Sequence, residues 1–346
     1  MTQSDQSDPS DPSDPSDPSE QSAARVPDGT ADAARQALQD VRREVGKAVV
    51  GQDAAVAGLL VALICEGHVL LEGVPGVAKT LLVRALSAAL GVETKRVQFS
   101  PDLMPGDITG SMMLDGHDGG LVFRPGPLFT NLLLADEINR TPPKTQSALL
   151  EAMEERQVSV DGTSHPLPVP FLVAATQNPV EFQGTYPLPE AQLDRFLLKV
   201  TLPVPGRDDE IEVLRRHAAG FDPHALASAG LATVASADQV RDAIASVSTV
   251  SVSPEVCGYV VDVARATRHS PSVALGVSPR GATALLRTSR AWAWLNGRDF
   301  VTPDDVKSLA SATLAHRMVL TPSAELEGVD TARVLATALQ SVAVPR

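Results

Sequence analysis

The segment that most constrains the fold is GVPGVAKT, at residues 73–80. It follows a short apolar run at residues 68–72 and opens a run with helical character at residues 81–86. A strand, a glycine turn, a Lys-Thr pair and a helix are together the parts of a phosphate-binding loop. Because the backbone N–H groups of such a turn and the amino end of the helix face an anion, the segment predicts a site for a triphosphate.

Within this loop, Lys79 is expected to reach the β- and γ-phosphates, and the Thr80 hydroxyl to hold Mg²⁺. One position departs from the usual pattern, because Ala78 stands where a glycine normally precedes the lysine. If position 78 needs a positive φ, alanine costs about 1–2 kcal/mol there, which phosphate contacts can offset. Taken alone, the segment also fits an ordinary strand–turn–helix with an accidental Lys-Thr pair.

Length and composition allow two domains with a sizeable core, since the chain has 346 residues of which 43% are hydrophobic. The net charge is −13, and residues 1–30 alone hold seven acids against one base. This balance argues against electrostatic wrapping of nucleic acid, although a local basic pore loop stays compatible with it. We expect neither a signal peptide nor a membrane span, and we interpret Cys65 and Cys257 as buried thiols in a reducing, cytoplasmic protein.

The order of patterns along the chain predicts three parts. Residues 1–34 form an acidic tail with repeated Ser-Asp-Pro, too poor in apolar side chains to fold. Residues 35–205 alternate short apolar strands (68–72, 94–99, 131–136 and 169–176) with helices at about 79–90 and 142–156, which predicts an α/β core with a parallel sheet. Two insertions, at residues 108–122 and 157–170, have the turn residues of hairpins. Residues 206–346 predict a smaller all-helical domain, with cap residues at Ser236, Ser253, Ser278 and Thr302.

Two further strands end in polar side chains that suit phosphoanhydride hydrolysis. The apolar run at residues 132–135 delivers Asp136 and Glu137, and we expect Asp136 to serve the Mg²⁺ shell and Glu137 to polarise the attacking water. The next apolar strand leads to Asn178, which we interpret as a γ-phosphate sensor; a turn-forming role before Pro179 is the alternative. Solvated acids at the end of a strand are the alternative for the carboxylates.

Two arginines are candidates for neutralising charge on the transferred phosphoryl group. Arg195 lies beside Phe196, and at the surface it would act on a neighbouring subunit; an ion pair with Asp194 or Glu190 is the alternative. Arg280 falls in the first turn of a predicted helix, where a cation opposes the helix dipole and an anion-binding role is favoured.

With these residues in place, the chain resembles the MoxR family of AAA+ ATPases over roughly residues 35–320. The matching motifs lie at residues 73–80, 98–105, 136–140, 175–179, 187–196 and 278–280. The resemblance implies an α/β P-loop NTPase core, a helical lid and a ring hexamer with ATP between subunits. It also implies roles for single residues: Arg195 as a finger acting in trans, Arg280 as the lid's nucleotide sensor and Gln98 as a switch partner of Glu137. The nucleotide contacts it implies are Val50, Gly51, Gly73, Pro75, Gly76, Val77, Ala78, Lys79, Thr80, Leu81 and Asp136.

In this family alanine at position 78 is itself typical, and the two hairpins match insertions that face the centre and the upper surface of the ring. The resemblance further implies chaperone-like work on proteins bearing von Willebrand factor A domains, often in metal insertion or complex maturation. We therefore expect an ATP- and Mg²⁺-dependent ATPase that remodels protein clients. A DNA-acting AAA+ motor or loader and a slow, nucleotide-gated scaffold are the alternatives.

Overall fold

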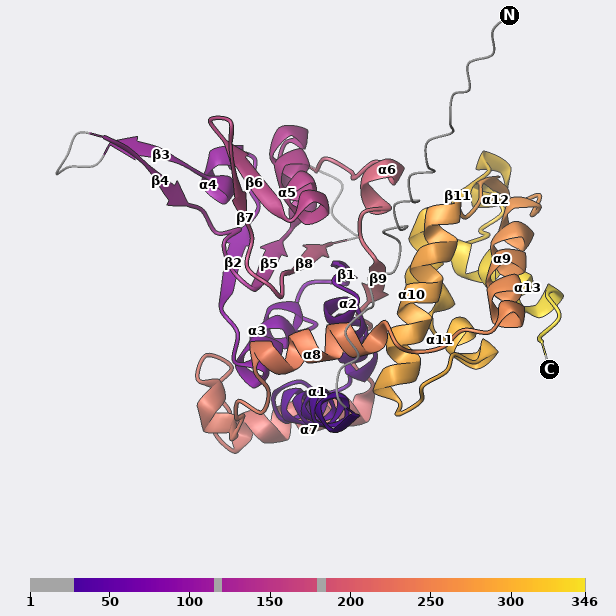
Figure 1. Ribbon diagram of the computed structural model, residues 1–346, viewed down its shortest axis with the longest axis horizontal. Helices are drawn as coiled ribbons and strands as arrows, with labels where there is room; N and C mark the ends of the chain where they lie inside the picture. The colour runs from indigo at the N-terminus through magenta and orange to yellow at the C-terminus, as the bar shows by residue number, and fades with distance from the viewer. Residues whose placement is uncertain (1–27, 115–119, 179–184, 346) are drawn as a thin grey trace, which may run out of the picture.

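A five-stranded parallel sheet forms the core of the chain (Figure 1). The computed structural model describes residues 28–114, 120–178 and 185–345. The strand order is β2-β5-β8-β1-β9, and each neighbouring pair runs parallel. Their bounds are β1 (Val69–Glu72), β2 (Thr94–Gln98), β5 (Leu132–Asp136), β8 (Leu172–Gln177) and β9 (Leu198–Thr201). The predicted α/β fold is confirmed, whereas β9 was missed because its short run of alternating polar and apolar residues follows the motif-rich segment 187–196.

The central strands β1, β5 and β8 are buried on both faces of the sheet, which explains why they are almost continuous apolar runs, whereas the edge strands β2 and β9 are not. Leu132 and Leu134 point toward helices α1 (Asp28–Ala48), α2 (Asp53–Ile64) and α3 (Lys79–Leu90). Leu133 and Ala135 point the other way, toward α5 (Pro143–Glu155). Alternate residues of one strand therefore belong to two separate apolar cores.

The two predicted hairpins are present. The first consists of β3 (Gly110–Leu114) and β4 (Leu121–Pro125), follows the short helix α4 (Pro105–Thr109) and projects away from the sheet (Figure 1). Its expected turn at residues 115–119 lies outside the described residues. The second consists of β6 (Gln157–Val160) and β7 (Thr163–Pro166), joined through Asp161 and Gly162. Both turn residues have positive φ, 48° and 77°, as a two-residue hairpin turn requires.

The second half of the chain is helical, as predicted. Ser236, Ser253, Ser278 and Thr302 each accept a hydrogen bond from the backbone N–H three residues on. The helices are α7 (Arg207–Ala218), α8 (Ala237–Val247), α9 (Pro254–Arg268), α10 (Pro279–Leu295), α11 (Pro303–Leu314), α12 (Pro322–Leu326) and α13 (Thr331–Ser341). Two short strands, β10 (Val273–Leu275) and β11 (Val319–Leu320), pair within this part.

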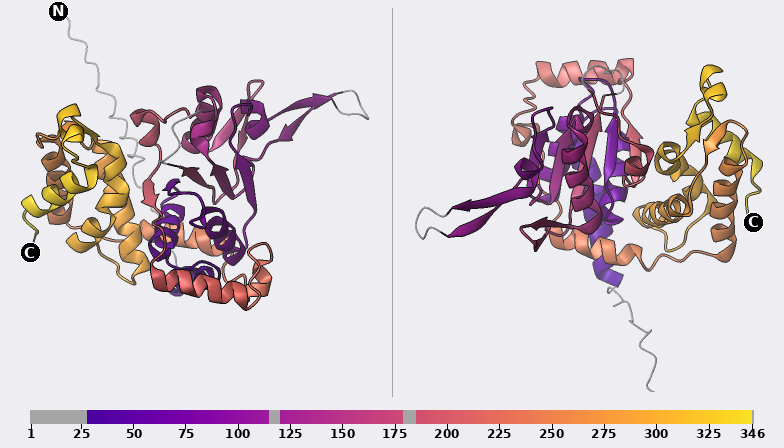
Figure 2. Two further views of the ribbon diagram at one scale, coloured as in Figure 1. Left: turned by 180° about the vertical axis from the view of Figure 1, so that it is seen from behind. Right: turned by 90° about the horizontal axis from the view of Figure 1, so that it is seen from above.

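The spatial division of the chain differs from the expected boundaries. Helices α9–α13 gather beside the β9 edge of the sheet, whereas α7 and α8 lie against the helices of the core (Figures 1 and 2). Arg216 of α7 donates to the carbonyls of Gly46 and Lys47 in α1, and α8 packs its apolar face on α1 and α2. The separate helical body therefore begins after α8 and not at residue 206.

The amino-terminal boundary also moves. Helix α1 begins at Asp28, so residues 28–34 are helical where a tail was expected, because Ala34 is buried in the core. The predicted disorder of residues 1–27 lies outside the described residues. Of the two thiols predicted to be buried, Cys65 is buried but Cys257 is exposed. Within the described segments, no helix is both long and apolar enough to cross a bilayer.

Candidate nucleotide site and a separate arginine cluster

The phosphate-binding loop follows β1 at the carboxyl edge of the sheet, where ligands of parallel sheets bind. Gly73 lies so close to the end of β9 that a Cβ there would be 2.9 Å from the Leu202 carbonyl oxygen. Gly76 and Ala78 both have positive φ, 89° and 63°, and α3 begins directly after them at Lys79. The Lys79 amine donates to the Gly73 carbonyl across the loop at 2.7 Å. A turn of this kind followed directly by the amino end of a helix is the arrangement that binds anions through backbone N–H groups.

Position 78 does need a positive φ: Ala78 adopts the left-handed conformation, with φ 63° and ψ 24°. For an L-residue with a side chain, this conformation costs about 1–2 kcal/mol. Strained backbone of this kind is found preferentially at binding sites. The geometry of a glycine-ended loop is thus kept although the glycine is absent.

A cavity of about 580 Å³ adjoins the loop on its apolar side. Pro75, Gly76, Val77, Ala78 and Leu81 line it from the loop and α3, and Val50 lines it from the segment between α1 and α2. Gly51 lines an adjoining cavity instead, beside Asp209. The opposite wall comes from α7, whose Val213, Leu214, His217 and Phe221 border the cavity (Phe221 just beyond the helix). These residues were not predicted as contacts; their helical spacing after the Pro-Gly at 205–206 was the only indication.

The two predicted carboxylates lie where β5 ends, at the same edge as the loop. Asp136 is 7% exposed and accepts a hydrogen bond from the Thr176 hydroxyl at 2.6 Å. The same Thr176 oxygen accepts from the backbone N–H of Glu137 at 2.9 Å. Thr176 therefore fixes both residues relative to β8. Asn178, which follows β8, is 5% exposed at this edge.

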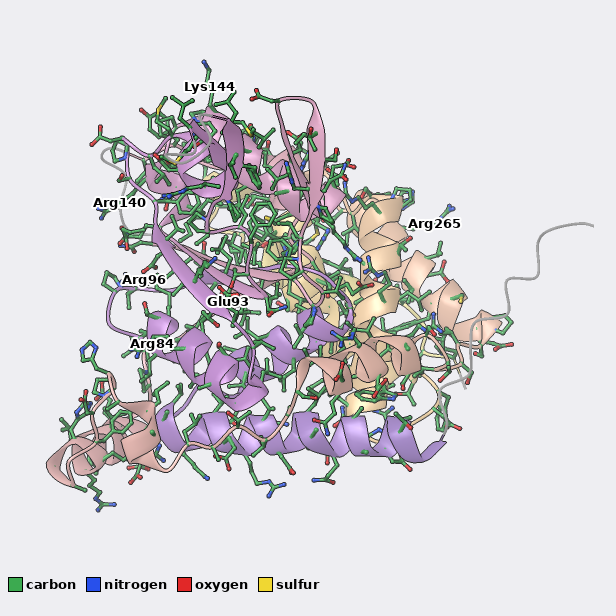
Figure 3. All side chains as sticks on the ribbon, turned by 60° about the vertical axis from the view of Figure 1, so that its left-hand side comes forward. Arg84, Glu93, Arg96, Arg140, Lys144 and Arg265 are labelled. Atoms are coloured by element: carbon green, nitrogen blue, oxygen red, sulfur yellow. The ribbon has the colours of Figure 1, made fainter. Side chains whose placement is uncertain are left out.

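Each carboxylate also has a basic or amide partner from the same chain. Arg96 of β2 donates to one oxygen of Asp136 through two nitrogens, at 2.7 and 3.1 Å. Gln98 donates to Glu137 at 2.5 Å, in agreement with its expected place as a partner, and Arg140 lies 3.1 Å from the same oxygen. Arg96 and Arg140 are labelled on one side of the molecule in Figure 3. Arg96 was not predicted as a site residue, although it lies two residues before Gln98 in β2, which puts both side chains on the same face of the strand.

The donor set at this edge suits Mg²⁺. Thr80 and Asp136 offer a hydroxyl and a carboxylate, and Mg²⁺ usually takes one or two carboxylates together with substrate phosphates. In the part of the chain that is described, no group of three or more His, Cys, Asp or Glu side chains could hold a metal alone. Any magnesium bound by Thr80 and Asp136 would therefore take its remaining ligands from the nucleotide and from water.

Arg195 and Arg280 lie at the other edge of the sheet. Strands β1 and β9 start in register, with Val69 beside Leu198, and the phosphate loop follows their far ends. Arg195 precedes β9, so the whole length of the strand separates it from that loop. Its guanidinium contacts Glu154 at 2.8 Å and donates to the Leu150 carbonyl at 3.0 Å, at the carboxyl end of α5. Its ion pair within the chain is thus with Glu154, and not with Asp194 or Glu190, the partners that the alternative to the finger role named.

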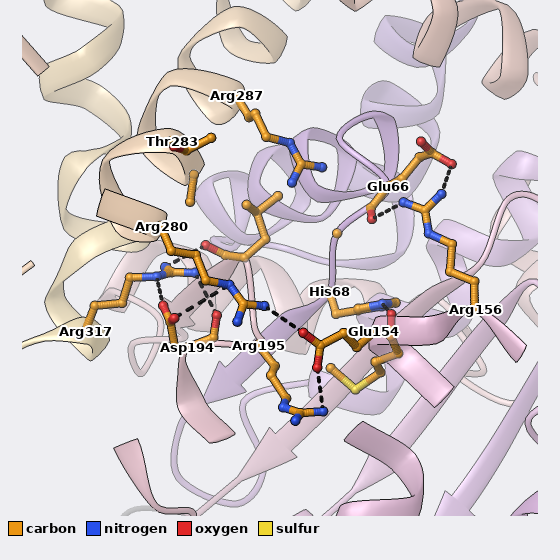
Figure 4. Close-up of a pocket in the computed structure, with 14 residues that line it drawn as sticks. Glu66, His68, Glu154, Arg156, Asp194, Arg195, Arg280, Thr283, Arg287 and Arg317 are labelled. Atoms are coloured by element: carbon orange, nitrogen blue, oxygen red, sulfur yellow. Dashed lines mark hydrogen bonds and ion pairs between the residues drawn. The ribbon is translucent and has the colours of Figure 1, made fainter. Parts of the chain in front are cut away.

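Arg280 occupies the first turn of α10, as predicted, but the lid carries it to Arg195 (Figure 4). It lies 3.5 Å from Glu154 and 3.6 Å from Asp194, and both arginines line a cavity of about 320 Å³. Within one chain, Arg280 therefore lies beside Arg195 and not beside the phosphate loop of the same chain. The reason is that α10 and α11 pack on α2 and β9, away from the cavity beside α7.

A buried histidine supports this arginine cluster. His68 is 5% exposed; its Nδ1 accepts from the Val173 N–H and its Nε2 lies 3.0 Å from the Met153 carbonyl. Burial lowers the pKa of His68 to about 4, so the ring is neutral and donates to Met153. His68 thereby ties the starts of β1 and β8 to the end of α5, one residue before Glu154.

Comparison with known proteins agrees with this architecture. Residues 68–198 match the model of the ATPase family associated with various cellular activities (AAA), and residues 265–338 match the AAA lid domain. The protein YeaC of Bacillus subtilis is 46% identical over 89% of this chain and 97% of its own length. Chaperone MoxR1 of Mycobacterium tuberculosis is 40% identical over 94% of this chain and 87% of its own. A crystal structure of a candidate ATPase from Cytophaga hutchinsonii superposes with a TM-score of 0.84 at 40% identity, covering 92% of this chain and 98% of the other. The chain is an ATP-binding ATPase, and it belongs to the MoxR family of AAA ATPases.

Proposed function

We propose that this ATPase works as a ring in which each ATP lies between two subunits, and that hydrolysis drives chaperone-like remodelling of protein clients. The observation that carries the first part is the separation of the site residues. The phosphate loop, Asp136, Glu137 and Asn178 lie at the carboxyl edge of the sheet, whereas Arg195 and Arg280 lie at the amino edge. A second copy of the chain is needed to bring both sets to one nucleotide.

Each residue then has a defined task. The loop N–H groups and Lys79 bind the phosphates, and the cavity beside Val50 and α7 takes the base. Glu137 accepts a proton from the attacking water, and Asn178 orients that water. Thr80 and Asp136 would hold Mg²⁺, which supplies positive charge against the β- and γ-phosphates.

The neighbouring subunit completes this site. Its Arg195 and Arg280 neutralise the charge that develops on the transferred phosphoryl group, a contribution worth about 10³- to 10⁵-fold in rate for an arginine finger. Gln98, bound to Glu137 at 2.5 Å, keeps the base away from water until the nucleotide and neighbour are in place. Family resemblance supports a ring of six subunits.

The first experiment tests the base. Glu137→Gln removes the proton acceptor but keeps the shape of the side chain, so it should bind ATP normally and hydrolyse it about 10²- to 10⁴-fold more slowly. Nucleotide affinity and single-turnover hydrolysis are measured on the same preparation. Hydrolysis near the wild-type rate would remove Glu137 from this role.

The second experiment tests the shared site. Lys79→Ala disables the loop but leaves the arginines intact, while Arg195→Ala does the reverse. Mixing the two inactive variants should restore about a quarter of wild-type activity, because one interface in four joins an intact loop to an intact arginine. If the mixture stays as inactive as each variant alone, Arg195 does not act across an interface.

The chaperone role rests on the chaperone MoxR1 relative and on the first hairpin. Across its strands Met113 faces Val122 and Leu114 faces Leu121, and these four side chains are 47–75% exposed. Exposed apolar pairs of this kind mark protein interaction sites. The resemblance supports a client or partner bearing a von Willebrand factor A domain, with metal insertion or complex maturation as its outcome.

The client is identified with the Glu137→Gln variant held in ATP, which should retain bound partners for identification. A second preparation in which Leu114 and Leu121 are both replaced by Ser should lose those partners. Salt-sensitive binding of duplex DNA by the chain would instead favour the DNA-acting alternative, against which the net charge of −13 argues.

A further inference from the structure

Arg317 is a buried arginine that the proposed chemistry does not use. It ends the short helix η3 (Ala315–Arg317) of the lid, and its side chain is 4% exposed. The guanidinium crosses from the lid to residues 194–197, which precede β9. It donates to the Asp194 carboxylate at 2.6 Å, to the carbonyls of Phe196 at 2.8 Å and Leu197 at 3.1 Å, and to the Asp194 carbonyl at 3.2 Å.

These acceptors lie on both sides of Arg195. Asp194 precedes it and Phe196 follows it, so the backbone that carries Arg195 is held from the lid. The Arg195 head is held separately, by Glu154 and the Leu150 carbonyl of α5. A movement of the lid would therefore shift the Cα of Arg195 relative to its guanidinium group, which is held on α5.

The same carboxylate joins Arg317 to the second arginine of the cluster. Arg317 takes one oxygen of Asp194, and Arg280 lies 3.6 Å from the other (Figure 4). Arg280 in turn lies 3.5 Å from Glu154, which pairs with Arg195. Arg317 is thus the buried end of a chain of charges that leads to both arginines of the cluster.

Stability alone explains this arrangement poorly. Burial lowers the pKa of Arg317, with Asp194 opposing the shift, which reflects the cost of taking a charge out of water. Buried ion pairs are often no more stable than apolar side chains of similar size. A guanidinium does offer what an apolar side chain cannot, namely five donors in a rigid plane that fix several acceptors at once.

We propose that Arg317 is a positioning residue that sets Arg195, and with it Arg280, for the nucleotide of the neighbouring subunit. The inference rests on the proposed function, since it concerns the arginines that complete that shared site. If Arg317 has this role, the orientation of the lid determines the rate of hydrolysis in the nucleotide site of the neighbouring subunit. The chain's own nucleotide pocket, at the opposite edge of the sheet, does not depend on it.

Arg317→Lys tests this, because lysine keeps the charge but cannot reach the carboxylate and the carbonyls together. Displacements of about 1 Å can cost 10²-fold in rate, so kcat should fall about 10- to 100-fold. The affinity for a fluorescent ATP analogue should stay within about twofold of wild type, since the loop and its cavity are untouched.

Mixing experiments separate positioning from damage to the fold. Arg317→Lys should be rescued by Lys79→Ala, which supplies intact arginines, and not by Arg195→Ala, which does not. A matched control is Arg298→Lys, which loosens a different lid ion pair, the one with Asp305. That control should lower the melting temperature and leave kcat within about twofold, since Arg298 contacts neither residue 194 nor 196.

The outcomes are distinguishable. If Lys79→Ala and Arg195→Ala fail to complement each other, the proposed function fails. If they do complement, rescue of Arg317→Lys by Arg195→Ala, failure of its rescue by Lys79→Ala, or wild-type kcat overturns the positioning role. Should Arg317→Lys not fold, Asp194→Asn breaks the same link from the other side and must show the same pattern of rescue.

Discussion

Lowering the pH should destabilise the fold, and the buried His68 contributes a part that can be measured by itself. His68 accepts from the Val173 N–H through Nδ1 and donates to the Met153 carbonyl through Nε2, each at 3.0 Å. A proton added to Nδ1 would replace that acceptor with a second donor facing Val173. Burial in addition disfavours the charged ring, and the pKa of His68 is lowered from 6.5 to about 4.

The sign and size of the effect follow from linkage. Between pH 6.5 and pH 4 the unfolded chain binds a proton at this position that the folded chain does not. The contribution of His68 to stability is therefore complete above pH 6.5 and is lost as the pH falls toward 4. Between about pH 7.5 and about pH 5 this amounts to about 2 kcal/mol of unfolding free energy.

Urea denaturation followed by circular dichroism, at both pH values, measures this contribution. Carboxylates and His316, whose pKa burial lowers to about 3, contribute to the pH dependence of any variant. The quantity of interest is therefore the difference between wild type and His68→Gln, which does not titrate. We expect the variant to be less stable at neutral pH but to lose about 2 kcal/mol less on acidification. Equal losses in the two proteins would refute the assignment of a neutral, buried His68.

Three substitutions test the nucleotide site. Gly73→Ala puts a Cβ 2.9 Å from the Leu202 carbonyl oxygen, so it should lower the unfolding free energy by about 1–3 kcal/mol and weaken ATP binding. Ala78→Gly removes the strain of an alanine in the left-handed conformation, but it also raises the entropy of the unfolded chain. The net effect should be an increase of up to about 1 kcal/mol in the unfolding free energy. Val213→Asp places a charge in the cavity of about 580 Å³ and should raise the Kd for ATP about tenfold or more, measured by isothermal titration.

Two of these substitutions have a control of the same type. Ala85→Gly lies inside α3 and should lower the unfolding free energy. If Ala78→Gly lowered it as well, the strain assigned to position 78 would be contradicted. Val261→Asp lies on the exposed face of α9, outside the cavity, and should leave ATP affinity unchanged. An unchanged melting temperature for Gly73→Ala would show that β9 can yield to the added methyl group.

Local patterns were sufficient to predict the elements that carry the chemistry. The loop at 73–80, the strands that end at Asp136 and before Asn178, and the helix caps at Ser253 and Ser278 depend on neighbours in sequence. Buried parallel strands are continuous apolar runs, and caps are chosen by the hydrogen bonds of the next three residues. These features could therefore be located from the sequence with errors of a few residues.

Contacts between distant segments could not be predicted in the same way. The pairing of Arg96 with Asp136, the wall that α7 adds to the base cavity, and the reach of Arg317 to residues 194–197 all join positions that are at least 40 residues apart. The hydrophobic periodicity of the sequence does not predict these contacts, because each depends on which surfaces pack together. The edge strand β9 was missed for a related reason, since its role comes from its place beside β1.

By itself, the sequence determined that the chain has an AAA-type α/β core and a helical lid, and that residues 73–80 form a phosphate-binding loop with an unusual alanine. Only the tertiary structure decided where the arginines lie. The sequence placed Arg280 in the first turn of a lid helix without saying what it faces, and the packing of α10 on α2 places it beside Arg195, at the opposite end of β1 and β9 from the phosphate loop. The physical reason is that the formation and capping of a helix depend on residues close in sequence. The edge of the sheet on which a whole lid packs depends instead on the sum of its long-range apolar contacts.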